Sequence, residues 1–398
     1  MKSDKTTPNV PTLRFKQYHC PWSTYHLSDI AEVVGGGTPD TTVSSLWNGD
    51  IQWFTPTEVG HQKYVSKSAR TITQLGLQKS SAKKLPAGSI LLSSRATIGE
   101  CSIAQRECTT NQGFQNLIPK KDTNNEFLYY LAQTKKHHFI KYASGSTFLE
   151  ISNSEIKKTK CTVPGTEEQT QIAAFLSALD DRIAVQNKII EDLKVLKKEL
   201  CAKLFGSPLC GRIIAIEQVA DIYGGYAFNS KAYVNKGKYK IVTIGNVTGD
   251  KYISGNYNTI DRLPNNIQKP QVLSKGDILV SLTGNVGRIS IVDGDEYLLN
   301  QRVAKLGIED DLTKEYIYQY LSNSSFEKDM INAGQGAAQK NIKNQDILSY
   351  CIRFPTDQTA LENIDKLLSL YDIRITSEKA ILSNLILQKS YYLRAMFI

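Results

Sequence analysis

Polar side chains that can read DNA bases gather on short loops at matching places in the two halves of this sequence. Arg, Asn, Gln, Ser and Thr hydrogen-bond to base edges, whereas further Lys and Arg contact phosphates. The alternative for each loop is a structural turn, in which the same side chains satisfy backbone groups. The candidate DNA-binding residues are Arg95, Thr97, Asn111, Gln112, Ser144, Ser146 and Thr147 in the first half, and Thr283, Asn285, Gln301, Arg302, Gln335, Gln339 and Lys340 in the second.

No catalytic or metal-binding pattern accompanies these loops. The sequence contains no Pro-Pro pair, and so no Asn/Asp-Pro-Pro-Tyr/Phe motif of amino-methyltransferases, and no GxxxxGK(S/T) phosphate loop. Its seven cysteines form no CxxC pair, and its five histidines have no metal-ligand spacing. The adjacent His137 and His138 fit a solvated helix surface better than a ligand pair. We therefore expect no catalytic residue, no metal site and no cofactor in this chain.

The composition is typical of a globular protein and favours a polyanionic partner. Hydrophobic residues make up 41% and charged residues 22%, which is enough apolar material for packed cores. The net charge of +9 suits double-stranded DNA, although many basic proteins bind no nucleic acid. We find no apolar leader at the start of the sequence and no run of about eighteen apolar residues that could span a membrane. The expectation is a cytoplasmic protein with reduced cysteines and no membrane contact.

The chain is an internal repeat with a period of about 190 residues. LPAGSILLSSRATIGECSIA from Leu85 matches LSKGDILVSLTGNVGRISIV from Leu273, and Asn111-Gln112 recurs as Asn300-Gln301. The matches keep their order and spacing, so chance is a poor explanation. The polar loops therefore belong to two copies of one structural unit.

Each copy is predicted to hold a mixed α+β head followed by a long helix. Short apolar runs at 89–93, 241–244 and 277–282 indicate strands, and helical patches follow at 126–135 and 315–321. The predicted fold class is α+β: two mixed α/β target-recognition domains separated by two long α-helices packed as an antiparallel coiled coil, with a pseudo-twofold internal repeat. The expected boundaries are 1–165 for the first head with its N-terminal arm, 166–206 for the first helix, 207–355 for the second head and 356–398 for the second helix.

Both helices carry apolar residues at coiled-coil spacing, and neither seam can be left in water. The predicted interface comprises Leu176, Leu179, Ile183, Ile190, Leu193, Lys197 and Leu200 from the first helix, and Leu368, Tyr371, Ile375, Glu378, Leu382, Leu385 and Tyr392 from the second. Two repeats that pair with themselves make an isologous contact, which sets the helices antiparallel. Matching the polar interruptions of the seams predicts a register with Lys197 opposite Glu378 and Gln186 opposite Lys389.

The sequence resembles the specificity subunits of type I restriction–modification systems. The resemblance covers nearly the whole chain, and it is least close at 226–228 and 357–361 of the second half. The segments that carry it are VPTLRF (10–15), LSDIAEVVGGGTP (27–39), WNGDIQWFTPTEVG (47–60), LPAGSILLSSRATIG (85–99), TTNQGFQNLIP (109–119) and PGTEEQTQIAAFLSALDDRI (164–183).

The resemblance implies a subunit without catalysis that binds a bipartite, asymmetric DNA target. It also implies two methyltransferase (modification) subunits docked on the helices and restriction subunits that join for cleavage. S-adenosylmethionine, ATP and Mg²⁺ would then be bound by those partners. The alternatives are a self-contained methyltransferase or nuclease that recognises bipartite DNA, and a coiled-coil interaction scaffold without a DNA role.

Overall fold

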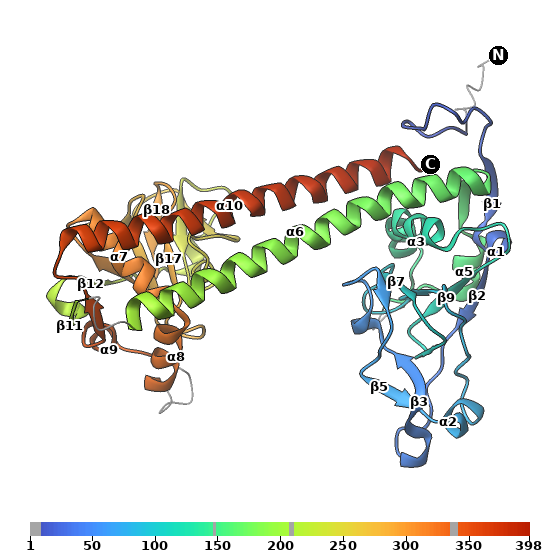
Figure 1. Cartoon of the computed structure of the whole chain (residues 1–398), viewed down its shortest axis with the longest axis horizontal. Helices are drawn as coiled ribbons and strands as arrows, with labels where there is room; N and C mark the ends of the chain where they lie inside the picture. Colours follow the sequence, from blue (N-terminus) through green and yellow to red (C-terminus); the bar gives the residue numbers. More distant parts are fainter. Residues whose placement is uncertain (1–8, 146–148, 207–210, 335–340) are drawn as a thin grey trace. The chain divides into compact units, whose positions relative to one another are not determined.

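A computed structural model describes residues 9–145, 149–206, 211–334 and 341–398. The contacts divide the chain into two compact units. Unit 1 comprises Met1–Val185 and Leu382–Ile398, and unit 2 comprises Gln186–Ile381. Each unit therefore contains one head and segments of both long helices, α6 (Thr166–Gly206, 41 residues) and α10 (Gln358–Ala395, 38 residues). Figure 1 shows these helices as the long green and red ribbons.

The head of unit 1 is built from mixed sheets covered by short helices. Its largest sheet has the strand order β2-β9-β6-β7-β4, a second sheet has the order β5-β3-β8, and β1 pairs with β10. The strands are β1 (Ser23–His26), β2 (Ala31–Gly35), β3 (Trp47–Phe54), β4 (Tyr64–Val65), β5 (Arg70–Ile72), β6 (Ile90–Leu92), β7 (Cys101–Ala104), β8 (Thr109–Thr110), β9 (Gln115–Pro119) and β10 (Lys160–Val163). The helices are α1 (Leu27–Ile30), α2 (Gln74–Gln78), α3 (Asn125–Thr134), α4 (Lys136–Lys141) and α5 (Asn153–Lys158).

The head of unit 2 repeats this plan. One sheet has the order β12-β19-β16-β17, another has the order β14-β13-β18-β15, and β11 pairs with β20. The strands are β11 (Arg212–Ala215), β12 (Asp221–Gly224), β13 (Tyr239–Val242), β14 (Asn258–Ile260), β15 (Val272–Leu273), β16 (Ile278–Ser281), β17 (Ile289–Ile291), β18 (Tyr297–Leu299), β19 (Val303–Gly307) and β20 (Cys351–Phe354). The helices are α7 (Asp311–Leu321), α8 (Ser324–Ala333) and α9 (Asn344–Leu348).

Local sequence explains why the equivalent elements form in both heads. The apolar strands β6 and β16 are fully buried in the interior of their sheets, as expected for a strand covered on both faces. The side chains of Asn124 and Asp310 accept hydrogen bonds from the backbone N–H groups of Phe127 and Thr313, and these N-caps start α3 and α7. The predicted α+β fold class with its repeat is confirmed.

One ion pair shows how far the repeat has diverged without losing its architecture. In unit 1, Lys136 at the start of α4 pairs with Glu100 at 2.5 Å. At the corresponding contact in unit 2 the charges are exchanged, because Arg288 pairs with Glu327 on α8 at 3.2 Å. The same contact is therefore maintained with opposite signs.

The long helices pack antiparallel within each unit. In unit 1, Phe175 of α6 lies edge-on to Tyr392 of α10, and Asp180 pairs with Lys389 at 2.6 Å. Every residue of the predicted seam is buried or half-buried. The prediction of paired antiparallel helices is confirmed.

The predicted register of these helices is wrong. In unit 2, the Gln186 amide donates to the side chain of Glu378, and Lys197 pairs with Asp372 at 2.5 Å. Lys389 meets Asp180 rather than Gln186. The prediction weighed only the polar residues on the seam, whereas the flanking aspartates supply the partners of both lysines.

Each long helix runs from one unit into the core of the other: α6 begins in unit 1 and ends in unit 2, and α10 begins in unit 2 and ends in unit 1. Met396 and Phe397, which follow α10, are buried in unit 1, where Phe397 stacks on Phe127 at 5.1 Å. Phe205 at the end of α6 is buried in unit 2, edge-on to Tyr316 at 5.7 Å. Both heads are thus completed by a phenylalanine from the helix of the other repeat.

Candidate nucleic-acid interface

Backbone hydrogen bonds bring the predicted polar loops of unit 1 together. The Ser94 N–H donates to the Gly113 carbonyl at 2.8 Å, and the Ile151 N–H donates to the Ser94 carbonyl at 3.0 Å. Ser144 and Glu150 exchange a pair of backbone hydrogen bonds. The loops that carry Arg95, Asn111 and Ser144 are far apart in sequence but form one surface.

The side chains on this surface are not equally available to a ligand. Arg95 is bonded to Glu150 through Nη2 at 2.5 Å and Nε at 3.1 Å, with 41% and 33% of the two side chains exposed. Thr97 is exposed, and Gln112 is exposed beside Thr38, whose hydroxyl donates to it. Asn111 uses its side-chain carbonyl to accept the Gly113 N–H. Asn111 therefore shapes the turn, while the other three present polar atoms outward.

Unit 2 repeats the convergence with different side chains. The Leu282 N–H donates to the Arg302 carbonyl and the Ile342 N–H to the Leu282 carbonyl, both at 3.0 Å. Asn285, Gln301 and Arg302 are exposed, and the guanidinium of Arg302 has no carboxylate partner in the described part of the chain. Thr283 is half-buried, and its hydroxyl has no hydrogen-bond partner within the described residues.

Five candidates lie outside the described residues. They are Ser146, Thr147, Gln335, Gln339 and Lys340. Their described neighbours Ser144 and Asn341 belong to the converging loops, since Ser144 bridges to Glu150 and Asn341 bridges to Thr283.

Both heads hold the same unusual backbone conformation at the tip of the first loop. Ala96 has a φ of +62°, and Gly284, its equivalent, has a φ of +69°. Glycine adopts this left-handed region freely, but an alanine there is strained. Strain that persists in a loop is typical of a position whose geometry matters for function. The backbone of the two loops therefore bends in the same way at this position.

Glu150 is a partner of Arg95 that was not among the predicted residues. It lies far along the chain from Arg95, so no local motif marks it. Because both side chains are partly exposed, their pairing contributes only about 0–1 kcal/mol. Arg95 can therefore leave Glu150 for another partner at little cost.

Large apolar side chains remain exposed along the long helices, away from the antiparallel seam. Contiguous exposed apolar side chains are typical of protein-binding surfaces. These residues are Val185, Ile386, Leu387 and Tyr391 in unit 1, and Ile189, Val195, Leu196, Leu367, Leu370, Ile373 and Ile381 in unit 2.

Among the residues that the structure describes, no group of His, Cys, Asp and Glu side chains is arranged to hold a metal ion. Within the same ranges, no helix combines the length and the apolar character needed to cross a bilayer.

The fold and the site define a duplicated recognition scaffold, in which each mixed α+β head presents converging polar loops and packs on antiparallel helix segments. The sequence pattern of one family, described as "Type I restriction modification DNA specificity domain", matches residues 20–195 and again 212–386. Since these matches cover most of the chain, the protein belongs to this family. The predicted resemblance is thereby confirmed.

Curated relatives agree with this assignment. The MjaIX specificity subunit of Methanocaldococcus jannaschii is 40% identical over 188 residues, which are 46% of this chain and 44% of that protein. The EcoR124I/EcoR124II specificity subunit of Escherichia coli is 28% identical over 45% of its length. The chain thus spans less than half the length of these relatives. A putative MjaX specificity subunit of M. jannaschii is 26% identical over 84% of this chain and 83% of that protein.

Solved structures support the fold. The S subunit of a type I restriction–modification system from M. genitalium has a TM-score of 0.56 and 16% identity, covering 98% of this chain and 99% of that one. A second chain, from a study of complex assembly and conformational transition of the type I system, has a TM-score of 0.59 and 17% identity, covering 94% and 98%. The repeated plan of two heads and paired helices is therefore that of known S subunits.

Proposed function

We propose that this chain is the non-catalytic DNA-reading subunit of a type I restriction–modification enzyme, with one head for each part of a bipartite, asymmetric DNA target. The observation that carries the proposal is the convergence of equivalent polar loops in both heads. The loops keep their backbone geometry while their side chains differ. Arg95 stands where the second head has Thr283, and Gly113 stands where it has Arg302. Two readers of one shape but different side chains suit two different half-sites.

The exposed apolar side chains of α6 and α10 support the second part of the proposal. Two methyltransferase subunits would cover this surface, and restriction subunits would join the assembly for cleavage. S-adenosylmethionine, ATP and Mg²⁺ would belong to these partners. The family's two matches, one in each repeat, favour one methyltransferase for each half of the chain.

The test uses the chain coexpressed with its methyltransferase partner, followed by mapping of methylated sites. Arg95→Ala should relax base preference in one half-site only, and Arg302→Ala in the other half-site only, each by about 1–3 kcal/mol of discrimination. The variants are each other's controls, since both remove one arginine from an equivalent surface. The proposal fails if either variant changes both half-sites.

A second experiment separates the proposal from a self-contained methyltransferase. The purified chain alone, incubated with DNA and labelled S-adenosylmethionine, should bind the DNA but transfer no methyl group. Binding should weaken steeply as salt increases, because phosphate contacts release counterions. Methyl transfer without a partner would contradict the assignment.

A further inference from the structure

A network of partly buried polar side chains joins the head of unit 1 to its helices. Lys63, which precedes β4, pairs with Glu126 of α3 at 3.1 Å and donates to the Ser177 hydroxyl on α6. That hydroxyl donates to Glu126 at 2.6 Å. Burial alone would raise the pKa of Glu126, but hydrogen bonds from Ser177, Tyr64 and Lys63 outweigh it and lower the pKa. The carboxylate is therefore held in its charged form by three side chains from two segments.

The same network continues to the second long helix. The Tyr130 hydroxyl on α3 donates to Asp180 of α6 at 2.6 Å and lies 3.4 Å from the Ser177 hydroxyl. Asp180 in turn pairs with Lys389 of α10 at 2.6 Å. The head of unit 1 is thus bonded directly to α6 and, through Asp180, to α10.

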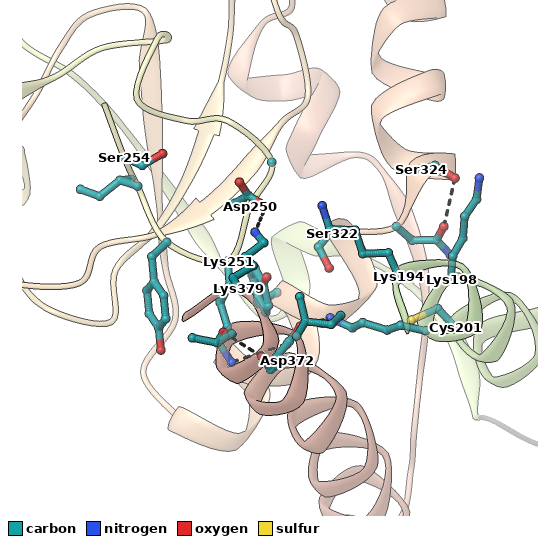
Figure 2. Close-up of a pocket in the computed structure, with 18 residues that line it drawn as sticks. Lys194, Lys198, Cys201, Asp250, Lys251, Ser254, Ser322, Ser324, Asp372 and Lys379 are labelled. Atoms are coloured by element: carbon teal, nitrogen blue, oxygen red, sulfur yellow. Dashed lines mark hydrogen bonds and ion pairs between the residues drawn. The ribbon is translucent and has the colours of Figure 1, made fainter. Parts of the chain in front are cut away.

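Unit 2 contains the equivalent network. Lys251 pairs with Glu315 of α7 at 3.0 Å and lies 3.6 Å from Asp372 of α10. The Gln319 amide donates to both carboxylates, at 3.0 and 2.8 Å. Asp372 also pairs with Lys197 of α6 at 2.5 Å. Figure 2 shows Lys251 and Asp372 beside a hollow of about 480 Å³ that they help to line.

The two networks correspond member by member under the internal repeat. Between the repeats α6 and α10 exchange their roles, and Gln319 stands where unit 1 has Tyr130. Ser369 lies 3.4 Å from Glu315, as its equivalent Ser177 lies beside Glu126. The equivalent pairs are Lys63 and Lys251, Glu126 and Glu315, Ser177 and Ser369, Asp180 and Asp372, and Lys389 and Lys197.

The ion pairs of both networks are largely shielded from solvent, with 9–29% of each side chain exposed. A buried ion pair adds little to stability compared with apolar packing, but it requires one geometry, because an unpaired buried charge is costly. Apolar packing is non-directional, whereas an ion pair adds a directional constraint on how a head sits on its helices. In unit 2, burial alone would lower the pKa of Lys251, but Glu315 and Asp372 outweigh it and raise the pKa. Lys251 therefore stays charged and requires both carboxylates, Glu315 and Asp372, as partners.

We propose that these two networks fix the angle of each head on its helix segments, and thereby set the number of base pairs accepted between the two half-sites. Lys63 and Lys251 are positioning residues in this scheme, since they act through the head and touch no base. The inference rests on the proposed function, and it assigns the gap specificity to residues remote from the reading loops.

The experiment measures methylation of a target library in which both half-sites are constant and only the gap varies, using the chain with its methyltransferase partner. Lys63→Met and Lys251→Met should lower the preference for the best gap over gaps one base pair longer or shorter by at least about tenfold, or about 1.4 kcal/mol. Base preference within each half-site should stay unchanged. Lys251→Arg keeps the positive charge and should retain much of the gap preference. If the Met variant acted only by destabilising the protein, the Arg variant would not restore the preference in this way.

Lys379→Met is the matched control. Lys379 pairs with Asp250 at 2.7 Å within unit 2, but 40% of its side chain is exposed, and the first repeat has Asn187 at the equivalent position. It should leave gap preference unaltered. If Lys63→Met does not fold, Tyr130→Phe removes only the hydroxyl that joins α3 to α6 and should broaden the gap preference less strongly.

The outcomes separate the two proposals. Folded variants that keep the gap preference of the unmodified chain would overturn the role of the networks. An unmodified chain that needs only one half-site would instead overturn the proposed function. A broadened gap preference with intact half-site reading supports both.

Discussion

Replacement of Arg14 tests how the segment before the first head is held on α6. The guanidinium makes paired bonds to Glu168, from Nε at 2.7 Å and from Nη2 at 2.8 Å, and Nη2 also donates to the Cys20 carbonyl at 2.7 Å. Only 11% and 4% of the Arg14 and Glu168 side chains are exposed. The hydrogen bond to Glu168 raises the pKa of Arg14, so the guanidinium stays charged.

Burial sets the size of the expected effect. A broken surface pair would cost about 0–1 kcal/mol, but Arg14→Met leaves the carboxylate of Glu168 buried without its partner, which costs about 3–5 kcal/mol. With a urea dependence of about 2–3 kcal/mol per molar, the unfolding midpoint of unit 1 should fall by roughly 1–2.5 M. Adding Glu168→Leu should restore much of this loss, since the uncompensated charge is then gone.

Tryptophan fluorescence isolates unit 1 in this assay. All three tryptophans of the chain, Trp22, Trp47 and Trp53, belong to unit 1. Arg182→Met on the exposed face of α6 is the matched control and should shift the midpoint little. A midpoint for Arg14→Met that stays close to the unmodified one, or a double variant no better than the single one, would refute the reasoning.

Two further predictions use the same readout. Phe397→Ala should destabilise unit 1 by about 3–5 kcal/mol and lower its fluorescence midpoint. Phe205→Ala should leave this midpoint unchanged and accelerate amide hydrogen exchange in unit 2. The opposite pattern would contradict the finding that each helix ends in the core of the other unit. Because the pKa of Glu126 is lowered in the folded state, its stabilisation is present above the unfolded value near 4.5 and is lost as pH falls through the folded value. The midpoint difference between the unmodified chain and Glu126→Gln should therefore vanish in acid, and a constant difference would contradict the role of this carboxylate.

The framework could be predicted from sequence because its signals are periodic. Strand β6 is an uninterrupted apolar run, and the helix seams repeat every few residues over the whole length of α6 and α10. Burial of such patterns is the dominant stabilising term, so the elements follow from them. The same periodicity explains the error in register, because several registers bury the same leucines. Asp180 and Asp372 lie beside the seam, and they select the observed register through the two lysines.

The polar partners could not be predicted because they depend on tertiary structure. The loops carrying Arg95 and Asn111 were identified by residue type, but the inward use of the Asn111 carbonyl and the pairing of Arg95 with Glu150 follow from how distant segments meet. The junction networks left a trace in the sequence, since Lys63-Tyr64 recurs as Lys251-Tyr252. Only the structure connects that repeat to the helices.

Because each long helix ends in the unit opposite to the one where it begins, the two units are completed in a fixed order during synthesis. Synthesis runs from the N-terminus, so residues 382–397, which complete the core of unit 1, leave the ribosome after every residue of unit 2. At about 5–20 residues per second, the intervening segment 186–381 delays them by roughly 10–40 s. During that interval the first head has been synthesised, but its core still lacks Phe397 beside Phe127. The head that begins earliest is therefore finished last, and a nascent chain cannot hold a complete first reader before its second one has been made.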